Sequence, residues 1–333
     1  MKVAIIGAGP AGIEAASLLA QQGVNVTLFE QEASPLKNLT DKAFLFPDFA
    51  EAEQLVLALT QKLRNPMIQV ETSTPIVDLQ EDSRQWILTT QQGKRHIFDR
   101  VLVATGYTPF DAHRKEELGY GIYKGIHTSL EMEQMLKTKH IVNTVGDIPR
   151  RITFLQCVGS RDEKTGNHYC SKICCVTAVK QAIEAKKLLP QTEVSVFYMD
   201  LRMWGQGFEE MYRHAQEEYH IQFVRGRISE ASSTFDGRVQ IKAEDTLMGL
   251  PLKMTTDLLI LMVGMEASQG TRTLAKACGQ CGDYGFFKTV DPQLGDNLTS
   301  LPHLYAAGTC KRPMSINDTL NDARSAAWRL MED

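Results

Sequence analysis

Residues 2–30, KVAIIGAGPAGIEAASLLAQQGVNVTLFE, decide how the rest of this chain is interpreted. A short apolar strand runs directly into GAGPAG, in which Gly7, Gly9 and Gly12 match the pattern G-x-G-x-x-G. In that pattern the first glycine permits a tight turn, the second lets the backbone approach a pyrophosphate, and the third allows close helix–strand packing. The N-terminal amides of the helix that follows would bind the diphosphate.

The next strand, NVTLFE, ends at Glu30, where an acidic residue typically binds a ribose hydroxyl of the dinucleotide. A tight turn alone would explain the glycines but not this acid. The order of strand, glycines, helix, strand and acid therefore predicts a Rossmann unit that binds a dinucleotide. The predicted contacts are Gly7, Gly9, Pro10, Ala11, Gly12 and Glu30.

Beyond Glu30 the chain becomes irregular, and the pattern then predicts a helix over 50–63. Strands near 67–79, 85–90 and 95–98 would form a small β-excursion. The stretch VLVATGYTP (101–109) is a further buried strand, which ends at Thr105 and Gly106. This Ala-Thr-Gly turn resembles the place where two-dinucleotide flavoproteins pass from the FAD domain to a second domain. The alternative is an ordinary turn at the end of a strand.

The second informative stretch is FLQCVGSRDEKTGNHYCSKICC (154–175), which holds Cys157, Cys170, Cys174 and Cys175. In a chain that we expect to be cytoplasmic, four gathered thiols indicate a metal site more readily than disulfides. Zinc sites usually combine two C-x-x-C pairs or mix Cys with His, and this spacing does neither. A 4Fe-4S cluster takes four thiolates, so these four cysteines are its candidate ligands. The alternative is a set of buried, unreactive thiols.

The cysteines lie where a second dinucleotide-binding unit would carry its glycines. A strand, RRITFLQCVG, precedes them, and a helix, CCVTAVKQAIEAKKLL, and a strand, EVSVFYMD, follow. The βαβ frame is thus retained while the glycine cradle is replaced, which weakens the expectation of tight NAD(P)H binding. Lys180 lies little more than one turn along this helix, where it could hydrogen-bond a flavin. A solvated helix lysine is the alternative.

The remaining sequence predicts the closure of both domains. A loop and amphipathic helix (201–219) lead to three strands over 221–230, 238–245 and 251–265. Cys278 and Cys281 form a C-x-x-C that could be a redox dithiol or half of a metal site, although no second cysteine pair is left to complete a zinc site. Two incidental thiols are the alternative.

A strand over 301–310 and a helix over 317–331 end the chain, with Ser315 and Asp318 as a capping pair. Such a helix N-terminus favours negative charge on a reduced flavin. We therefore expect Gly308, Thr309, Ile316 and Asn317 to contact the cofactor.

Composition limits the classes of function. The net charge is −4 and no basic block occurs, which argues against a nucleic-acid partner. The longest apolar run (258–265) is far too short to span a membrane. The N-terminal glycines and Glu14 suit a strand–turn–helix better than a signal peptide, so we expect mature, cytoplasmic sequence. The 333 residues suggest two domains.

Taken together, these motifs resemble HdrA, the flavin subunit of heterodisulfide reductase. The matching phrases include FLQCVGSRD, YCSKICC, VFYMDLR, GQGFEEMY and AAGTC, and the likeness extends over nearly the whole chain. The resemblance implies that the four cysteines bind a 4Fe-4S cluster close to FAD, with Lys180 beside the isoalloxazine as the catalytic residue. It also implies a thioredoxin-reductase-like α/β core with two dinucleotide-binding domains, and a homodimer.

Two departures refine the resemblance. The ferredoxin-like modules of the methanogen type and the family's Gly-Gly after the ribose-binding acid are absent from this sequence. The short form resembles the HdrA-like subunit of the sulfur-oxidising heterodisulfide-reductase-like complex. That likeness implies HdrB-like and HdrC-like subunits and a lipoate-binding protein as partners.

These observations predict an α/β flavoprotein whose discontinuous FAD domain (1–115 and 285–333) encloses a degenerate NAD(P)-type domain (145–270) carrying the cysteine loop. Residues 116–144 and 271–284 would be connections, and the first of them would contain one helix, SLEMEQMLKT (129–138). The expected function is electron transfer between FAD and the cluster, with possible bifurcation or confurcation. The alternatives are the flavin subunit of a quinone-interacting oxidoreductase and an NAD(P)H-dependent disulfide reductase that uses Cys278 and Cys281.

Overall fold

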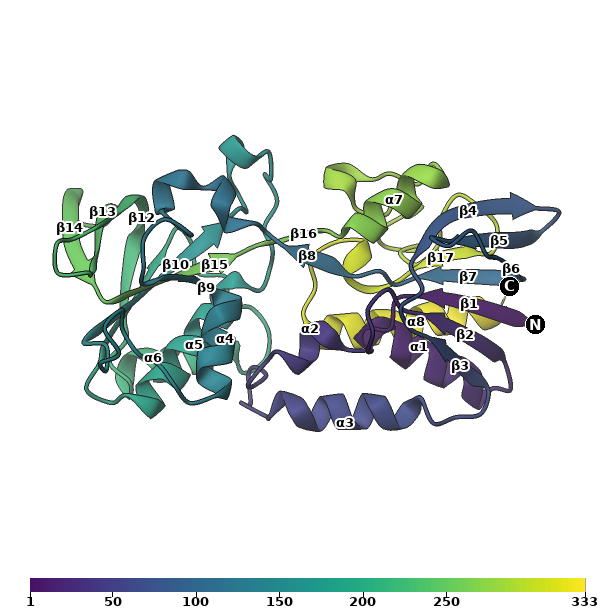
Figure 1. Ribbon diagram of the computed structural model, residues 1–333, viewed down its shortest axis with the longest axis horizontal. Coiled ribbons are helices and arrows are strands. Elements are labelled where there is room, and N and C mark those ends of the chain that lie inside the picture. The colour runs from purple at the N-terminus through teal and green to yellow at the C-terminus, as the bar shows by residue number, and fades with distance from the viewer. Residues whose placement is uncertain (333) are drawn as a thin grey trace. The chain divides into compact units, whose positions relative to one another are not determined.

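A computed structural model describes residues 1–332, and the chain forms two compact units (Figure 1). Unit 1 comprises Met1–Thr40, Glu53–Thr108 and the chain from Met265 onward. Unit 2 comprises Asp41–Ala52 and Pro109–Gly264. Each unit is built around its own sheet, so each can be described by itself.

Unit 1 contains a five-stranded parallel sheet in the order β17-β7-β1-β2-β3. Its strands are β1 (Lys2–Ile6), β2 (Asn25–Phe29), β3 (Ile68–Glu71), β7 (Arg100–Val103) and β17 (Leu304–Ala306). After Lys2 the central β1 is an unbroken apolar run, as expected for a parallel strand that is buried on both faces. Helix α1 (Pro10–Gln21) packs against the C-terminal helix α8 (Ile316–Glu332), and α3 (Ala52–Lys62) precedes β3 along the chain.

A three-stranded antiparallel sheet completes unit 1. It consists of β4 (Ile76–Asp82), β5 (Gln85–Thr90) and β6 (Arg95–Phe98), and α7 (Gln269–Ala277) packs against β4. Alternate residues of β5, including Trp86 and Leu88, are buried, as expected for a strand with one face on the core.

Unit 2 contains a seven-stranded sheet in the order β14-β13-β12-β11-β10-β15-β9. Its strands are β9 (Ile126–Thr128), β10 (Arg151–Val158), β11 (Glu193–Tyr198), β12 (Gln222–Ser233), β13 (Val239–Asp245), β14 (Leu250–Thr256) and β15 (Leu258–Val263). The neighbouring strands β9, β15, β10, β11 and β12 run parallel to one another. At the other edge, β12, β13 and β14 pair antiparallel. Helices α4 (Ser129–Lys137), α5 (Cys174–Leu188) and α6 (Phe208–Glu217) bury their apolar faces in one core with this sheet.

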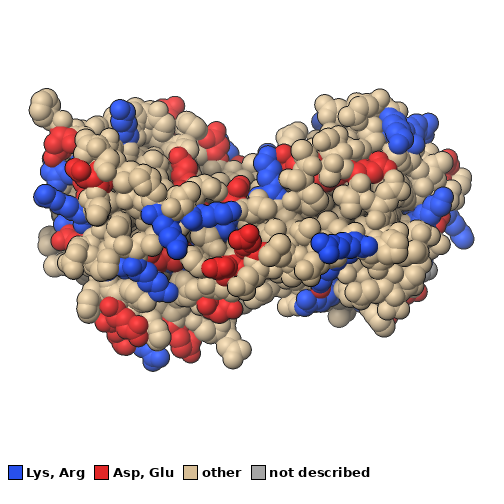
Figure 2. Space-filling view, turned by 60° about the horizontal axis from the view of Figure 1, so that its bottom comes forward, with Lys and Arg blue, Asp and Glu red and all other residues tan. Residues whose placement is uncertain are grey.

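The remaining elements are short. They are α2 (Lys37–Thr40), the paired strands β8 (Tyr107–Pro109) and β16 (Met265–Ala267), and single 3-10 turns at Ala112–Arg114, Glu116–Leu118, Glu163–Thr165, Asp283–Gly285 and Gly308–Cys310. Among residues 1–332 no helix is both long and apolar enough to cross a membrane. On the face drawn in Figure 2, basic and acidic side chains are interspersed rather than gathered into a block of one sign.

The predicted α/β class and the order of most elements are confirmed, but the unit boundaries differ from the expected ones. The predicted connection 116–144 belongs to unit 2, because β9 extends the sheet beside β15 and α4 packs on α5. The predicted connection 271–284 belongs to unit 1 through α7. The single strand expected over 251–265 is divided into β14, β15 and β16, with turns between them.

Candidate functional site

The glycine turn of unit 1 has the close contacts that its motif predicts. A Cβ on Gly12 would lie 1.9 Å from the Gly7 carbonyl oxygen, and one on Gly7 would lie 2.3 Å from the Ala104 carbonyl oxygen. Gly7 also has a φ of +110°, which side chains rarely tolerate. A Cβ on Gly9 would meet no atom within 4 Å in residues 1–332. Two glycines are therefore fixed by packing, and the third leaves room for a ligand to approach the backbone.

Glu30 holds this turn in place. Its Oε2 accepts a hydrogen bond from the Ala8 N–H at 2.7 Å, and its Oε1 accepts one from the Glu32 N–H at 2.9 Å. A carboxylate has about four acceptor positions, so both oxygens can also accept hydroxyl donors. The residue predicted to bind ribose thus has a second task that the sequence did not reveal, which is to fix the glycine turn.

Two further predicted segments reach the same carboxyl edge of the parallel sheet. After β7, the Thr105 Oγ1 lies 2.7 Å from the Thr271 Oγ1, and the Thr105 carbonyl accepts a hydrogen bond from the Ser268 hydroxyl. After β17, a Cβ on Gly308 would lie 2.9 Å from that of Ala11, so this turn packs against the start of α1. Ligands of open α/β sheets bind at this edge, and these contacts fit a dinucleotide there.

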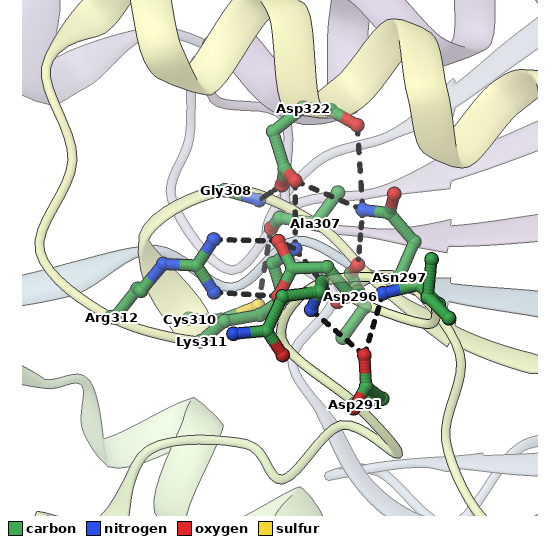
Figure 3. Close-up of polar contacts among 12 residues, drawn as sticks. Asp291, Asp296, Asn297, Ala307, Gly308, Cys310, Lys311, Arg312 and Asp322 are labelled. Atoms are coloured by element: carbon green, nitrogen blue, oxygen red, sulfur yellow. Dashed lines mark hydrogen bonds and ion pairs between the residues drawn. The ribbon is translucent and has the colours of Figure 1, made fainter.

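A buried charged network fixes the Gly308 turn, and Figure 3 shows Asp322 of α8 reaching toward it. Asp322 Oδ2 accepts a hydrogen bond from the Gly308 N–H at 2.6 Å, and its Oδ1 accepts bonds from Lys311 at 2.7 Å and Asn297 at 3.0 Å. Lys311 is buried and also pairs with Asp296 at 3.0 Å. Sequence reasoning missed Asp322, because only the packing of α8 brings it to the turn.

The start of α8 has the predicted cap. The Ser315 Oγ accepts a hydrogen bond from the Asp318 N–H at 3.1 Å, and Asp318 accepts a bond in return from the Ser315 hydroxyl at 2.8 Å. Ile316 therefore begins the helix, and Asn317 follows it. The amides of this first turn form a positive helix end of the kind that favours an anionic group.

The four clustered cysteines lie between the end of β10 and the start of α5 in unit 2. Cys157 is the last residue but one of the strand, Cys174 and Cys175 open the helix, and Cys170 lies in the loop between them. Every one of the six pairs among them interacts electrostatically, and all four are free thiols. Although these cysteines are spread over 19 positions of the sequence, the fold brings them into one group.

Burial and mutual repulsion make three of these sulfurs, those of Cys157, Cys174 and Cys175, costly to ionise. Burial, followed by the charge of Cys175, raises the pKa of Cys157 to about 12, and burial raises the pKa of Cys174 well above its usual range. A metal bound to the sulfurs would supply the missing positive charge, since thiolates rather than thiols are the ligands.

Backbone amides already point at the sulfurs. The Lys172 N–H donates to Cys170 Sγ at 3.3 Å, and the Cys157 and Arg202 amides donate to Cys174 and Cys175. Donors of this kind are typical of iron–sulfur sites, where they tune the cluster. Among residues 1–332, however, no three or more Cys, His, Asp or Glu side chains converge at metal-binding geometry. The residues fit a cluster in chemistry and burial, and the cluster itself stays a prediction.

Lys180 lies inside unit 2 rather than on its surface. The residue is 2% exposed, and its ammonium donates to Glu133 Oε1 at 2.6 Å and to the Phe44 carbonyl at 2.8 Å. The alternative of a solvated helix lysine is therefore wrong. Glu133 was missed by sequence reasoning because it lies on α4, within the segment that was predicted to be a connection.

The other thiols with a shifted pKa are protonated at neutral pH. Burial raises the pKa of Cys278 to about 11 and that of Cys310 to about 12. Cys281 is exposed, and neither it nor Cys278 is in a disulfide. A reactive dithiol needs a depressed thiol pKa, and the raised pKa of Cys278 is the opposite of that property.

Comparison with known sequences gives one consistent result. Residues 1–148 match the family of pyridine nucleotide-disulphide oxidoreductases. The chain is 41% identical over 237 residues to the A subunit of an H(2)/formate:CoB-CoM heterodisulfide,ferredoxin reductase from Methanococcus maripaludis. It is 40% identical over 237 residues to the iron-sulfur A subunit of the CoB–CoM heterodisulfide reductase from Methanocaldococcus jannaschii. Each alignment covers 68% of this chain but 36% of the relative, so the chain spans about a third of their length.

Solved structures agree on the fold. The thioredoxin reductase of Lactococcus lactis superposes with a TM-score of 0.71 and 16% identity, covering 99% of this chain and 98% of that one. The enzyme of T. acidophilum gives a TM-score of 0.69 at 17% identity, covering 99% of this chain and 97% of that one. At such identities the likeness establishes a thioredoxin-reductase-like α/β fold and carries no conclusion about chemistry.

Proposed function

This chain belongs to the HdrA family of heterodisulfide reductase subunits, and we propose that it is an oxidoreductase subunit that transfers electrons between FAD and a 4Fe-4S cluster. The single observation that supports this most strongly is the gathering of Cys157, Cys170, Cys174 and Cys175 at the N-terminus of α5. That position in unit 2 corresponds to the glycine turn before α1 in unit 1. Each unit would thus hold one redox group at the end of its first Rossmann strand.

Unit 1 would bind FAD. The turn of Gly7, Gly9 and Gly12 leaves backbone amides for the pyrophosphate, and the carboxylate of Glu30 would bind the ribose. The remaining proposed contacts are Pro10, Ala11, Thr105, Gly106, Gly308, Thr309, Ile316 and Asn317. When bound, a flavin supplies chemistry in which electrons enter as a pair and leave singly.

Unit 2 would hold the cluster through its four cysteines. The amides that donate to the sulfurs lower the cost of keeping negative charge in a buried site. The relative from Methanocaldococcus jannaschii is named an iron-sulfur subunit, which is consistent with this assignment. Arg161 adds a cation beside Cys157, since its guanidinium lowers the pKa of that thiol against the effect of burial.

Lys180 is the proposed catalytic residue, from its place in the sequence resemblance. Its ammonium is held by Glu133, which accepts further hydrogen bonds from Gln181 Nε2 at 2.7 Å and from the Ala43 N–H at 3.0 Å. The charges of Lys180 and Lys42, followed by the hydrogen bonds from Lys180 and the Ala43 amide, lower the pKa of Glu133 against the effect of burial. A fixed negative partner holds the ammonium of Lys180 in place, where it can donate a hydrogen bond and stabilise negative charge.

The finer parts of the proposal concern the setting of this subunit. We propose a cytoplasmic complex of sulfur oxidation, with HdrB-like and HdrC-like subunits, a lipoate-binding protein and a second copy of this chain as partners. Bifurcation or confurcation would depend on redox potentials. A quinone-interacting oxidoreductase is the second candidate complex, and NAD(P)H is a candidate electron donor or acceptor. The raised pKa of Cys278 disfavours a disulfide reductase that uses the Cys278–Cys281 pair.

Anaerobic purification, followed by measurement of flavin, iron and acid-labile sulfide, tests the proposal. We expect one FAD and one 4Fe-4S cluster per chain. A Cys278→Ser variant should contain the same amount of iron, because Cys278 is not a proposed ligand. A yellow protein that contains FAD but no iron, even after reconstitution with iron and sulfide, would contradict the proposed function.

A further inference from the structure

Glu184 is a carboxyl whose burial no hydrogen bond explains. It lies on α5, one turn after Lys180, and it is 4% exposed. Neither of its side-chain oxygens has a hydrogen-bond partner among residues 1–332. Buried polar groups are nearly always hydrogen-bonded, so an acid that loses its water without gaining a partner needs a reason. The charged group beside it is Lys180, whose Nζ lies 3.9 Å from Oε2.

The positive charge of Lys180 is already balanced by another residue. Glu133 accepts a hydrogen bond from it at 2.6 Å and has bonds from Gln181 and Ala43 as well. A negative Glu184 would therefore be a second carboxylate facing one lysine in a buried place. Charged groups without hydrogen bonds are far costlier to bury than neutral ones, so the neutral acid is the favoured form.

Burial is the main cause that brings the titration of Glu184 near neutrality, and neighbouring charges modify it. Burial raises its pKa to about 7, Lys180 and Lys187 on α5 act to lower it, and Glu133 on α4 acts to raise it further. The charge of Lys42, in the segment 41–52, lowers the pKa of Glu133. Glu184 can therefore hold or release a proton within the range in which a cytoplasmic enzyme works.

We infer that Glu184 is a positioning residue that exchanges a proton with Lys180 and so restores the ammonium after Lys180 has given up a proton. This inference rests on the proposed function, in which Lys180 serves the flavin. When bound, a flavin would take up a proton with its electrons, and one N–H bond of Lys180 would break to supply that proton. One O–H bond of Glu184 then breaks as its proton passes to the amine. Water later returns a proton to the carboxylate, and Glu133 keeps its charge throughout.

Infrared titration of the anaerobically purified holoprotein tests the protonation state and the coupling. The carbonyl stretch of a protonated carboxylic acid should disappear with a midpoint near pH 7 and should be absent from Glu184→Gln. In Lys180→Met the midpoint should rise, because the cation that opposes the effect of burial is gone. An identical spectrum in Glu184→Gln, or an unchanged midpoint in Lys180→Met, would overturn the inference. Neither readout depends on a bound flavin.

The pH profile of the flavin midpoint potential tests the role. The wild-type slope should change near pH 7, and that change should vanish in Glu184→Gln while flavin and iron contents stay at wild-type levels. Glu217→Gln, on the exposed side of α6, is the matched control and should retain the wild-type profile. If the midpoint potential of the flavin depends on pH in the same way in Glu184→Gln and in wild type, the proton exchange is refuted, whereas the proposed function is not. A protein without iron would refute the proposed function, and the infrared titration would still decide the state of Glu184.

Discussion

The two units share a frame of strand, turn and helix, and they differ in what occupies the turn. In unit 1 the turn between β1 and α1 is Gly7–Gly9, and packing leaves no space for side chains at Gly7 and Gly12. In unit 2 the turn between β10 and α5 runs over residues 159–173, and its flanks carry cysteines. The backbone would approach the ligand in the first unit, whereas side-chain sulfurs would face it in the second.

Under the proposed function, this difference would let one frame suit two kinds of redox group. A short turn offers only amides and the positive end of a helix, which suit a phosphate. A long turn can fold back and bring soft side-chain ligands together at the same helix end. Three residues of the cysteine segment that are not glycine have left-handed backbone, namely Cys157, Arg161 and Lys172. Such backbone is expected where a loop reverses tightly.

The largest expected effect comes from a substitution that changes only the turn between β10 and α5 in unit 2. Cys174→Ser should lower iron to about a tenth of the wild-type content or less, because a 4Fe-4S cluster needs four thiolates. Flavin content should stay unchanged, since unit 1 has a core of its own. Iron analysis and visible absorption of the anaerobic protein measure both. Equal iron in Cys174→Ser and wild type would remove Cys174 from the ligand set.

The next largest effect comes from a substitution that changes only the glycine turn between β1 and α1 in unit 1. Gly12→Ala places a Cβ 1.9 Å from the Gly7 carbonyl oxygen, so the turn must open, at a cost of about 3 kcal/mol. Flavin should bind about 100-fold more weakly, as that energy implies, and iron should be unaffected. Gly9→Ala is the control for folding, because its Cβ meets no described atom within 4 Å. Tight flavin binding by Gly12→Ala would contradict the packing argument.

The helices after the two turns sharpen the comparison, because each buries one glutamate in a different setting. Glu14 on α1 pairs with Lys62 and Arg324, whose hydrogen bonds outweigh burial and lower its pKa. Its stabilising contribution is present above its usual pKa and is lost as pH falls. Glu184 on α5 has its pKa raised to about 7, so its contribution is present at low pH and is lost as pH rises through 7.

Glu184→Gln should therefore remove a pH dependence. Between pH 5 and pH 8 the wild type should lose up to about 3 kcal/mol of its free energy of unfolding through the ionisation of Glu184, since each pKa unit is worth about 1.4 kcal/mol. The variant should not show this loss. Thermal unfolding at a series of pH values measures this difference. Parallel curves for variant and wild type between pH 5 and 8 would show that Glu184 does not titrate in the folded protein.

The smallest expected effect concerns the acid at the end of β2. Glu30→Gln keeps an oxygen for the Ala8 amide but loses the negative charge, which costs about 1 kcal/mol of hydrogen bonding. Flavin should bind about 5-fold more weakly, with the cluster unchanged. Fluorescence titration of the deflavinated protein with FAD measures the affinity. An unchanged affinity would mean that Glu30 serves the turn and not the ribose.

Much of unit 1 could be predicted from sequence because its signals are local. The strand, the glycines and the helix of residues 2–21 follow from hydrophobic pattern and turn chemistry, and the capping pair of Ser315 and Asp318 is readable at a spacing of three residues. The partners of these residues could not be predicted in the same way. Asp322 reaches Gly308 only because α8 packs on α1.

Unit 2 was harder to predict for a physical reason. The helix over 129–138 could be predicted within the connection 116–144, but its packing in unit 2 could not, and neither could the pairing of β9 with β15. The burial of Lys180 depends on its long-range pair with Glu133, and a lysine on a helix gives no local sign of it. The unpartnered state of Glu184 likewise depends on everything that packs around α5.

The most direct test of the comparison is a redox titration of the anaerobic holoprotein monitored by electron paramagnetic resonance. We expect a signal of a reduced 4Fe-4S cluster to appear as the potential is lowered, in a protein that also contains FAD, and to be absent from Cys174→Ser. A protein that binds FAD and gives no cluster signal at any potential would contradict the claim that the second turn has exchanged a phosphate site for a metal site.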